Sequence, residues 1–210
     1  MIKKLFTFSL LMLTACSSQP EQSSYTHAHT THNHEQIQDD KPVHSRKNPF
    51  EGVLEAHNRV RIRHGLQPLK WSNKLASYSE QWANHLGASG RCKMIHRPGT
   101  PPYGENLYWA SPLSWSTGKT SVQDVSIQEV VKTWADEEKW YDYTSNRCEP
   151  GKQCGHYTQI VWQDTSEVGC ALKVCADKSQ SWVCSYNPAG NYVGQRPYEK
   201  KTQISMNSTH

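Results

Sequence analysis

Hydrophobic positions recur at helical spacing in three segments of the chain, 48–65, 72–87 and 126–141. Within each segment, the side chains that would share one face lie three or four residues apart. These positions are Phe50, Val53, Leu54 and His57 in the first segment, Leu75, Tyr78, Trp82 and Leu86 in the second, and Val130, Trp134, Glu137 and Tyr141 in the third. Residues suited to helix ends flank the first two segments, namely Asn48, Pro49 and Gly65, and Ser72 and Gly87. The pattern predicts three amphipathic helices.

The last third of the chain alternates between apolar and polar side chains, with the period of two that is typical of strands. We predict strands over 156–162, 168–176 and 182–187, with 177–181 as the loop between the last two. In the first of these strands, His156 would share a face with Ile160 and Trp162. Prolines and glycines in 87–109 exclude long regular structure there. Helices on antiparallel strands define an α+β class, layered as helix, sheet and helix.

The N-terminal residues have the pattern of an export signal. Two lysines precede the apolar run from Leu5 to Leu13, which is too short to span a bilayer. The run ends in Leu13-Thr14-Ala15-Cys16, which resembles the lipobox of bacterial lipoproteins. The resemblance implies a lipoprotein signal peptide over 1–15 and lipid on Cys16. Because no Asp follows Cys16, it also implies an outer-membrane lipoprotein of the cell envelope, the alternative being an extracellular protein.

Residues 16–47 are polar and contain few apolar side chains, so we expect a disordered tether. This tether is rich in histidine, at positions His27, His29, His32 and His34. Such a segment can bind zinc, copper or nickel weakly; the alternative is a solvated linker without a role in metal binding. Residues 199–210 are predicted to be a disordered tail. The folded domain is therefore expected over 48–198.

Charge and cysteine content narrow the classes of protein. The net charge is +4 and no long basic run is present, which does not favour a nucleic-acid partner. Apart from Cys16, the cysteines are Cys92, Cys148, Cys154, Cys170, Cys175 and Cys184. An even number in an exported protein indicates three disulfides in an oxidising compartment, with the pairing left open.

Two titratable residues interrupt apolar faces. Glu137 falls within the apolar face of the third helix, where a carboxylate is costly unless it is paired, hydrogen-bonded or bound to metal. Its neighbour Glu138 lies about a hundred degrees further around the helix and is predicted to be a solvated charge. His156 lies in the apolar row of its strand. It is either a buried core histidine or a functional group whose partners come from elsewhere in the chain.

Several ordered motifs resemble those of the CAP superfamily, which comprises cysteine-rich secretory proteins, antigen 5 and pathogenesis-related 1 proteins. They are AHNRVR, PLKWSNKLA, YGENL, GHYTQIVWQDT, CSYNPAGNY and GNYVGQRPY. The resemblance covers about Asn48 to Tyr198 and implies a three-layer α-β-α sandwich with a central, mainly antiparallel sheet. Two features depart from the family pattern. Ser181 and Trp182 replace an aliphatic pair, and the segment 109–123 is longer than usual and is expected to border the cleft.

The resemblance also implies a functional cleft. Its residues would be His96, Glu105, Glu137 and His156, with the two histidines holding a divalent cation such as zinc and the glutamates binding directly or through water. The alternative is a hydrogen-bonded cluster that steadies the fold. The implied disulfides are Cys92–Cys175, Cys148–Cys154 and Cys170–Cys184. His57 of AHNRVR is expected to pack or form hydrogen bonds instead.

These observations favour a lipid-anchored, non-enzymatic binding module, since several family members bind sterols or fatty acids. A metal-dependent or serine hydrolase is the first alternative, with His96 or His156 and Glu105 orienting water or the hydroxyl of Ser111. The sequence lacks GxSxG and HExxH, and no nucleophile is identified. The second alternative is zinc or copper handling at the envelope, in which the tether histidines would collect cations for the cleft.

Overall fold

The computed structural model describes residues 48–200, and the fold is that of this part of the chain. The expected signal peptide, Cys16, the histidine-rich tether with His27, His29, His32 and His34, and residues 201–210 lie outside the described residues. Within 48–200, no helix is both long and apolar enough to cross a membrane.

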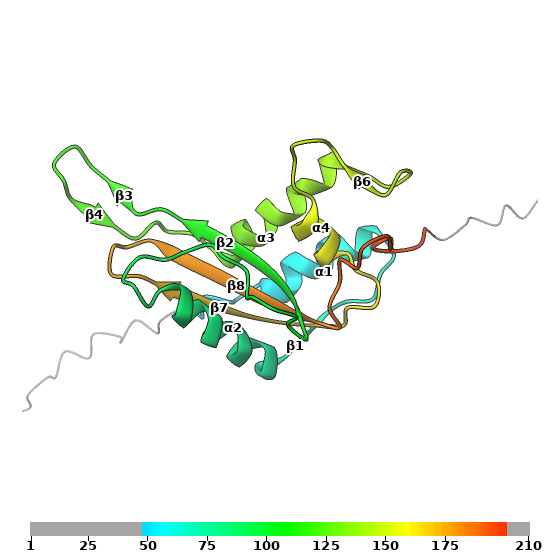
Figure 1. Cartoon of the computed structure of the whole chain (residues 1–210), viewed down its shortest axis with the longest axis horizontal. Coiled ribbons are helices and arrows are strands. Elements are labelled where there is room, and N and C mark those ends of the chain that lie inside the picture. The colour runs from blue at the N-terminus through cyan, green and yellow to red at the C-terminus, as the bar shows by residue number, and fades with distance from the viewer. Residues whose placement is uncertain (1–47, 201–210) are drawn as a thin grey trace, which may run out of the picture. The chain divides into compact units, whose positions relative to one another are not determined.

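A four-stranded sheet forms the middle layer, in the order β1-β7-β8-β2 (Figure 1). Its strands are β1 (Lys70–Trp71), β2 (Gly104–Ala110), β7 (Glu167–Val174) and β8 (Gln180–Asn187). Strand β8 pairs antiparallel with both β7 and β2, whereas the short β1 pairs parallel with β7. The sheet is therefore mainly antiparallel, as the family resemblance implied.

Helices cover both faces of this sheet (Figure 1). They are α1 (Val53–Arg63), α2 (Asn73–Leu86), α3 (Ile127–Ala135), the 3₁₀ helix η1 (Asp136–Trp140) and α4 (Gly155–Ile160). The α2 side buries Trp82 and Leu86 against strand residues that include Val183. The opposite side packs α1, α3 and α4 over a larger core that includes Trp134 and Trp182. This arrangement confirms the α+β class and the α-β-α layering.

Two small hairpins complete the described fold. They are β3 (Leu113–Ser114) with β4 (Thr120–Ser121), and β5 (Tyr141–Asp142) with β6 (Arg147–Cys148). The β3–β4 hairpin extends outward beyond the end of β2 (Figure 1). It lies within the segment that is longer than the family pattern. The other departure, Trp182, is buried in β8 and packs edge-on against Phe50.

The predicted strand over 156–162 is wrong, because these residues form α4 and the turn after it. The buried positions Tyr157, Ile160 and Val161 are three and four residues apart, which is the spacing of a helix face. Arg61 of α1 holds the end of this segment by donating to the carbonyls of Ile160 and Trp162, each at 2.8 Å. Burial lowers the pKa of Arg61 to about 10.

The three long helices occur where they were predicted, with changes at their ends. The first begins at Val53 rather than at Pro49, because Gly52 adopts a left-handed conformation with φ of 81° at the N-cap. The third begins after a capping box between Ser126 and Glu129. It tightens into the 3₁₀ segment η1 from Asp136 onward, and this segment carries Glu137.

Three disulfides join Cys92 to Cys175, Cys148 to Cys154 and Cys170 to Cys184, which is the pairing that the resemblance implied. The first ties the loop after α2 to the end of β7. The second closes the loop before α4, and the third crosses between β7 and β8 in the sheet. The disulfide before α4 fixes the residue that precedes the helix carrying His156.

Candidate functional site

One pocket, of about 260 Å³, brings three of the four family-implied residues together. His96 comes from the loop after α2, Glu105 from the start of β2, and His156 from the first turn of α4. The remaining lining residues are Asn106, Gln153, Gly155 and Asn191. No residue of the long segment 109–123 lines this pocket, so the expectation that it borders the cleft is not met.

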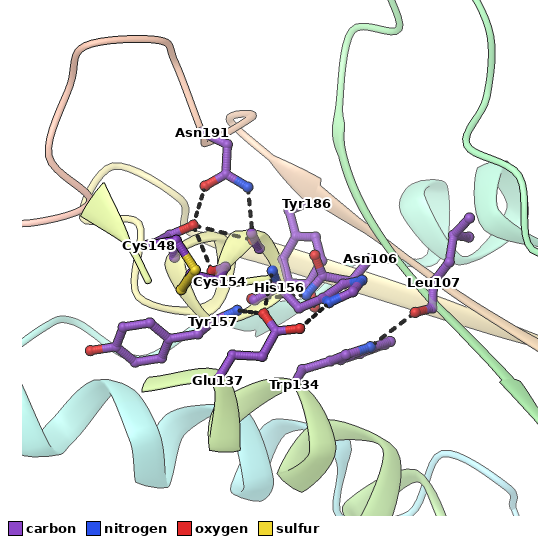
Figure 2. A network of polar contacts seen from close by, with 12 residues as sticks. Asn106, Leu107, Trp134, Glu137, Cys148, Cys154, His156, Tyr157, Tyr186 and Asn191 are labelled. Carbon is purple, nitrogen blue, oxygen red and sulfur yellow. Dashed lines mark hydrogen bonds and ion pairs between the residues drawn. A yellow bond between two sulfur atoms is a disulfide. The ribbon is translucent and has the colours of Figure 1, made fainter. Parts of the chain in front are cut away.

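Glu137 lies behind this pocket and binds the imidazole of His156. The carboxylate Oε1 is 2.6 Å from His156 Nδ1, and the two side chains are 9% and 16% exposed. The ring of His156 also stacks on the indole of Trp134, with centroids 5.9 Å apart. Figure 2 shows Glu137 reaching from its helical segment toward His156 and Tyr157. A hydrogen bond to Glu137 and the indole of Trp134 therefore fix the position of the imidazole.

The same carboxylate satisfies the first turn of α4. Glu137 Oε2 accepts hydrogen bonds from the backbone N–H groups of His156, at 3.0 Å, and Tyr157, at 3.2 Å. These N–H groups have no partner within their own helix, and a negative charge is favourable at a helix N-terminus. Glu137 thus caps a helix to which it is not connected in sequence, and this explains how a buried carboxylate is accommodated.

The second histidine–glutamate pair, His96 and Glu105, is more exposed than the pair of His156 and Glu137. His96 Nδ1 lies 2.8 Å from Glu105 Oε1, with the histidine side chain 64% exposed and the glutamate side chain 9% exposed. The same oxygen accepts from the backbone N–H of Arg97 at 3.1 Å. The guanidinium of Arg97 in turn lies 3.9 Å above the ring of Tyr78. The hydrogen bond to Glu105 raises the pKa of His96.

The two histidine–glutamate pairs have the same geometry. In each, a glutamate binds Nδ1 of the imidazole, which leaves Nε2 as the nitrogen suited to an external partner. Carboxylates hold metal-binding histidines in this way in many proteins. Within residues 48–200, however, no three His, Cys, Asp or Glu side chains are placed together as a ready metal-binding group. The two imidazoles of His96 and His156 line one pocket, with a carboxylate behind each.

A series of hydrogen bonds that was not predicted connects the pocket to the buried core. Asn106 donates from Nδ2 to the backbone carbonyl of His156, at 3.1 Å, and to the hydroxyl of Tyr186, at 3.2 Å. The same hydroxyl lies 2.9 Å from Nε2 of His57, whose Nδ1 is 2.8 Å from the carbonyl of Val53. His57 is thus buried and hydrogen-bonded, as expected. Asn106 follows Glu105 in the YGENL motif, which is the one sequence signal that could have identified it.

Ser111, the hydroxyl considered for a hydrolase, lies elsewhere. It follows the end of β2, and its Oγ accepts a hydrogen bond from Gln123 Nε2 at 3.1 Å. It does not line the pocket that contains His96, Glu105 and His156. The geometry therefore does not join this hydroxyl to the histidines.

A second, larger recess of about 800 Å³ lies between α1 and α3. Small and medium apolar side chains from both helices form its floor, namely Ala56, Val60, Val131 and Ala135. Its rim carries the cations Arg59, Arg63, Lys132 and Lys139 and the acids Glu129, Asp136 and Glu138. The recess is an apolar groove with a charged border, and its volume falls within the range typical of small-molecule sites.

The fold and the pocket define a class of protein: an α-β-α domain with three disulfides and two histidine–glutamate pairs at one pocket. The sequence profile of the cysteine-rich secretory protein family, CAP, matches residues 54–186, and the chain belongs to this family. The disulfides and the family agree with a secreted or extracellular location.

The curated relatives include plant proteins. The chain is 41% identical over 153 residues to pathogenesis-related protein PR-1 of Medicago truncatula, covering 72% of this chain and 79% of the relative. It is 44% identical over 148 residues to pathogenesis-related protein 1A1 of Solanum lycopersicum, covering 69% and 74%. Among solved structures, venom allergen-like protein 4 of Schistosoma mansoni matches with a TM-score of 0.55 at 25% identity, covering 73% of this chain and 96% of that one. The bacterial lipoprotein assignment stays a prediction from the lipobox resemblance.

Proposed function

We propose that this chain is an exported, non-enzymatic binding protein whose groove between α1 and α3 takes an apolar ligand such as a fatty acid or a sterol-like molecule. The observation that carries this proposal is the groove itself, with its apolar floor and about 800 Å³ of space. Burying an acyl chain there would remove apolar surface from water on both partners, which is the main driving force for such ligands.

The rim of the groove favours an acidic head group. It carries four cationic side chains and three acidic ones. Lys132 pairs with Asp136 at 2.6 Å and Arg63 pairs with Glu138 at 2.7 Å. Lys139 instead lies over the ring of Trp140, with its Nζ 4.3 Å from the ring centroid. A carboxylate at the end of an acyl chain would find Lys139 beside the groove.

A fluorescent fatty acid titrated into the protein tests this proposal. We expect saturable binding that Ala135→Trp weakens by about tenfold or more, because the indole would fill the apolar floor. Ala176→Trp is the matched control, since Ala176 is exposed in the β7–β8 loop and should bind like the unchanged protein. The absence of saturable uptake of any fatty acid or sterol would refute the ligand proposal.

We further propose that the pocket binds a divalent cation such as zinc through Nε2 of His96 and His156. The support is that both rings line one pocket with Nδ1 already bound to a glutamate, which sets the tautomer and raises the basicity of the other nitrogen. When bound, the cation would act as a Lewis acid. The carboxylates of Glu105 and Glu137 would then orient the ligands rather than bind the ion themselves.

Calorimetric titration with zinc measures the affinity of this pocket for the cation. His96→Ala and His156→Ala should each reduce the affinity of the pocket for zinc by about tenfold or more, because each removes one of the two proposed ligands. Deleting residues 27–34 separates the pocket from the histidine-rich tether. A deletion that removes all zinc binding, with the two alanine variants unaffected, would place the metal on the tether and refute the pocket.

A further inference from the structure

We propose that the β3–β4 hairpin is a membrane-contacting element, which places its tip in the interfacial layer of a bilayer with anionic lipids. This inference does not depend on the ligand groove or on the cation pocket. It concerns the segment 109–123, which neither of those sites includes.

The hairpin presents large apolar side chains to solvent. Trp115 is 49% exposed and Leu113 is 42% exposed, and Trp109, at the root of the hairpin, is 41% exposed. The hairpin extends outward beyond the sheet rather than folding over it (Figure 1). Exposed indoles of this kind carry an apolar body with a polar N–H, a combination that favours the membrane–water interface.

The register of the hairpin places these side chains together with a cation. Leu113 and Trp115 are two residues apart, so they point to the same face of β3 and its extension. Leu113 is opposite Ser121, and the backbone N–H of Trp115 donates to the carbonyl of Lys119 at 3.0 Å. Lys119 is exposed at the tip, next to the indole. A lysine can keep its ammonium at the head groups while an apolar neighbour enters the bilayer.

The charge of the segment fits an anionic surface. Between Asn106 and Gln123 the sequence contains Lys119 but no Asp or Glu. Arg91 and Lys93 are exposed on the preceding loop, which contacts the root of the hairpin through a 2.9 Å hydrogen bond from Trp109 Nε1 to the carbonyl of Cys92. Each basic residue near such a surface strengthens binding by about fivefold.

A bilayer fits this surface better than a second copy of the chain. The exposed parts of the Trp109, Leu113 and Trp115 side chains together amount to on the order of 300 Å². This area is well below the roughly 800 Å² per partner of a stable protein interface. The lipobox resemblance of Leu13 to Cys16 supplies a second reason. A lipid on Cys16 would keep the domain within reach of the membrane through residues 17–47, so weak contacts at the hairpin would suffice.

Vesicle flotation with residues 17–210, which lack the lipidation cysteine, tests the hairpin directly. We expect binding to vesicles of phosphatidylcholine and phosphatidylglycerol, and a loss of about tenfold in the double variant Leu113→Ser/Trp115→Ser. Lys119→Gln should reduce the preference for phosphatidylglycerol over pure phosphatidylcholine about fivefold. Ile62→Ser is the matched control: Ile62 is 65% exposed on α1, and its removal should leave flotation unchanged.

Three results would overturn the proposal. They are no flotation of the unchanged protein, equal flotation of the double variant, and self-association in sedimentation that the double variant abolishes, which would make a second copy the partner. Circular dichroism confirms that the double variant folds, as expected for exposed positions. Ala135→Trp should impair fatty-acid uptake without changing flotation, so failure of the groove proposal and failure of the hairpin proposal are distinguishable.

Discussion

At the residue scale, the adjacent Glu137 and Glu138 have very different surroundings. The Glu137 side chain is 9% exposed and accepts three hydrogen bonds, from His156 and Tyr157. Glu138 pairs at the surface with Arg63 and His64.

We expect Glu137→Gln to lower the free energy of unfolding by about 2 kcal/mol or more, because only one of the two terminal atoms of the amide can accept a hydrogen bond. Glu138→Gln, the matched control, should cost less than about 1 kcal/mol. Urea unfolding at neutral pH measures both, and equal losses would contradict this account of Glu137.

His57 makes stability depend on pH. Burial lowers its pKa from 6.5 to about 4. Between these values the unfolded chain takes up a proton and the folded protein does not, so acid favours unfolding. The contribution of neutral His57 is complete above pH 6.5. We expect about 3 kcal/mol of stability to be lost as the pH falls from about 6.5 to about 4.

Unfolding free energies of the unchanged protein and of His57→Gln across this pH range check the prediction. The variant loses hydrogen bonds at every pH, so the comparison concerns the slope rather than the absolute stability. The variant should show the shallower decline on acidification. Parallel curves for the two proteins would mean that His57 does not titrate in this way.

At the scale of elements, Gly169 sets how closely α2 approaches the sheet. A Cβ atom at this position of β7 would overlap the backbone of Ala76 and Ser72. We expect Gly169→Ala to destabilise the fold by about 2 kcal/mol or more, since backbone cannot yield as a flexible side chain can. Gly155→Ala is the control, because its Cβ would meet only Asn191 Nδ2 at 3.8 Å. Thermal unfolding should show a clear drop in midpoint for the first variant and little change for the second.

The sequence predicted elements well where one face is long and continuously apolar. The α2 helix and the hairpin of β7 and β8 follow from periodicity alone. The α4 helix does not, because over six residues His156, Thr158 and Ile160 alternate like a strand while Tyr157 and Ile160 also fit a helix. Groups distant in sequence bind both of its ends: the carboxylate of Glu137 accepts from N–H groups of the first turn, and Arg61 donates to carbonyls at the last. Strand β2 was missed because Pro and Gly precede it and a single edge pairing with β8 defines it.

The candidate site was predictable in part. Helical periodicity marked Glu137 as a buried carboxylate in need of partners, and the structure supplies them. His96 and Glu105 lie on a loop and at a strand end, where no periodicity marks them, so only the family motifs identified them. Asn106 and Arg97 act through backbone and aromatic contacts that exist only in the folded chain.

At the scale of the whole molecule, the disulfides differ in how much of the chain they constrain. Cys92 and Cys175 are 83 residues apart, and Cys148 and Cys154 are 6 apart. Loop-closure entropy predicts losses of about 4.5 and about 2 kcal/mol when each bond is removed by paired Cys→Ala substitution. Urea unfolding of the two double variants measures the difference. A larger loss for the short loop would show that the bond before α4 acts mainly on the native state.

The two oxygens of the Glu137 carboxylate have different partners, and this affects what a substitution in each half of the pocket does to the fold. One oxygen binds the imidazole of His156 and the other caps α4, so a change at Glu137 alters the chemistry of the pocket and the folding of a helix together. His96 is exposed on a loop, and its glutamate supports one backbone N–H besides the ring. A substitution at His96 therefore changes the pocket with little effect on the folding of a helix, whereas a substitution at Glu137 changes both together.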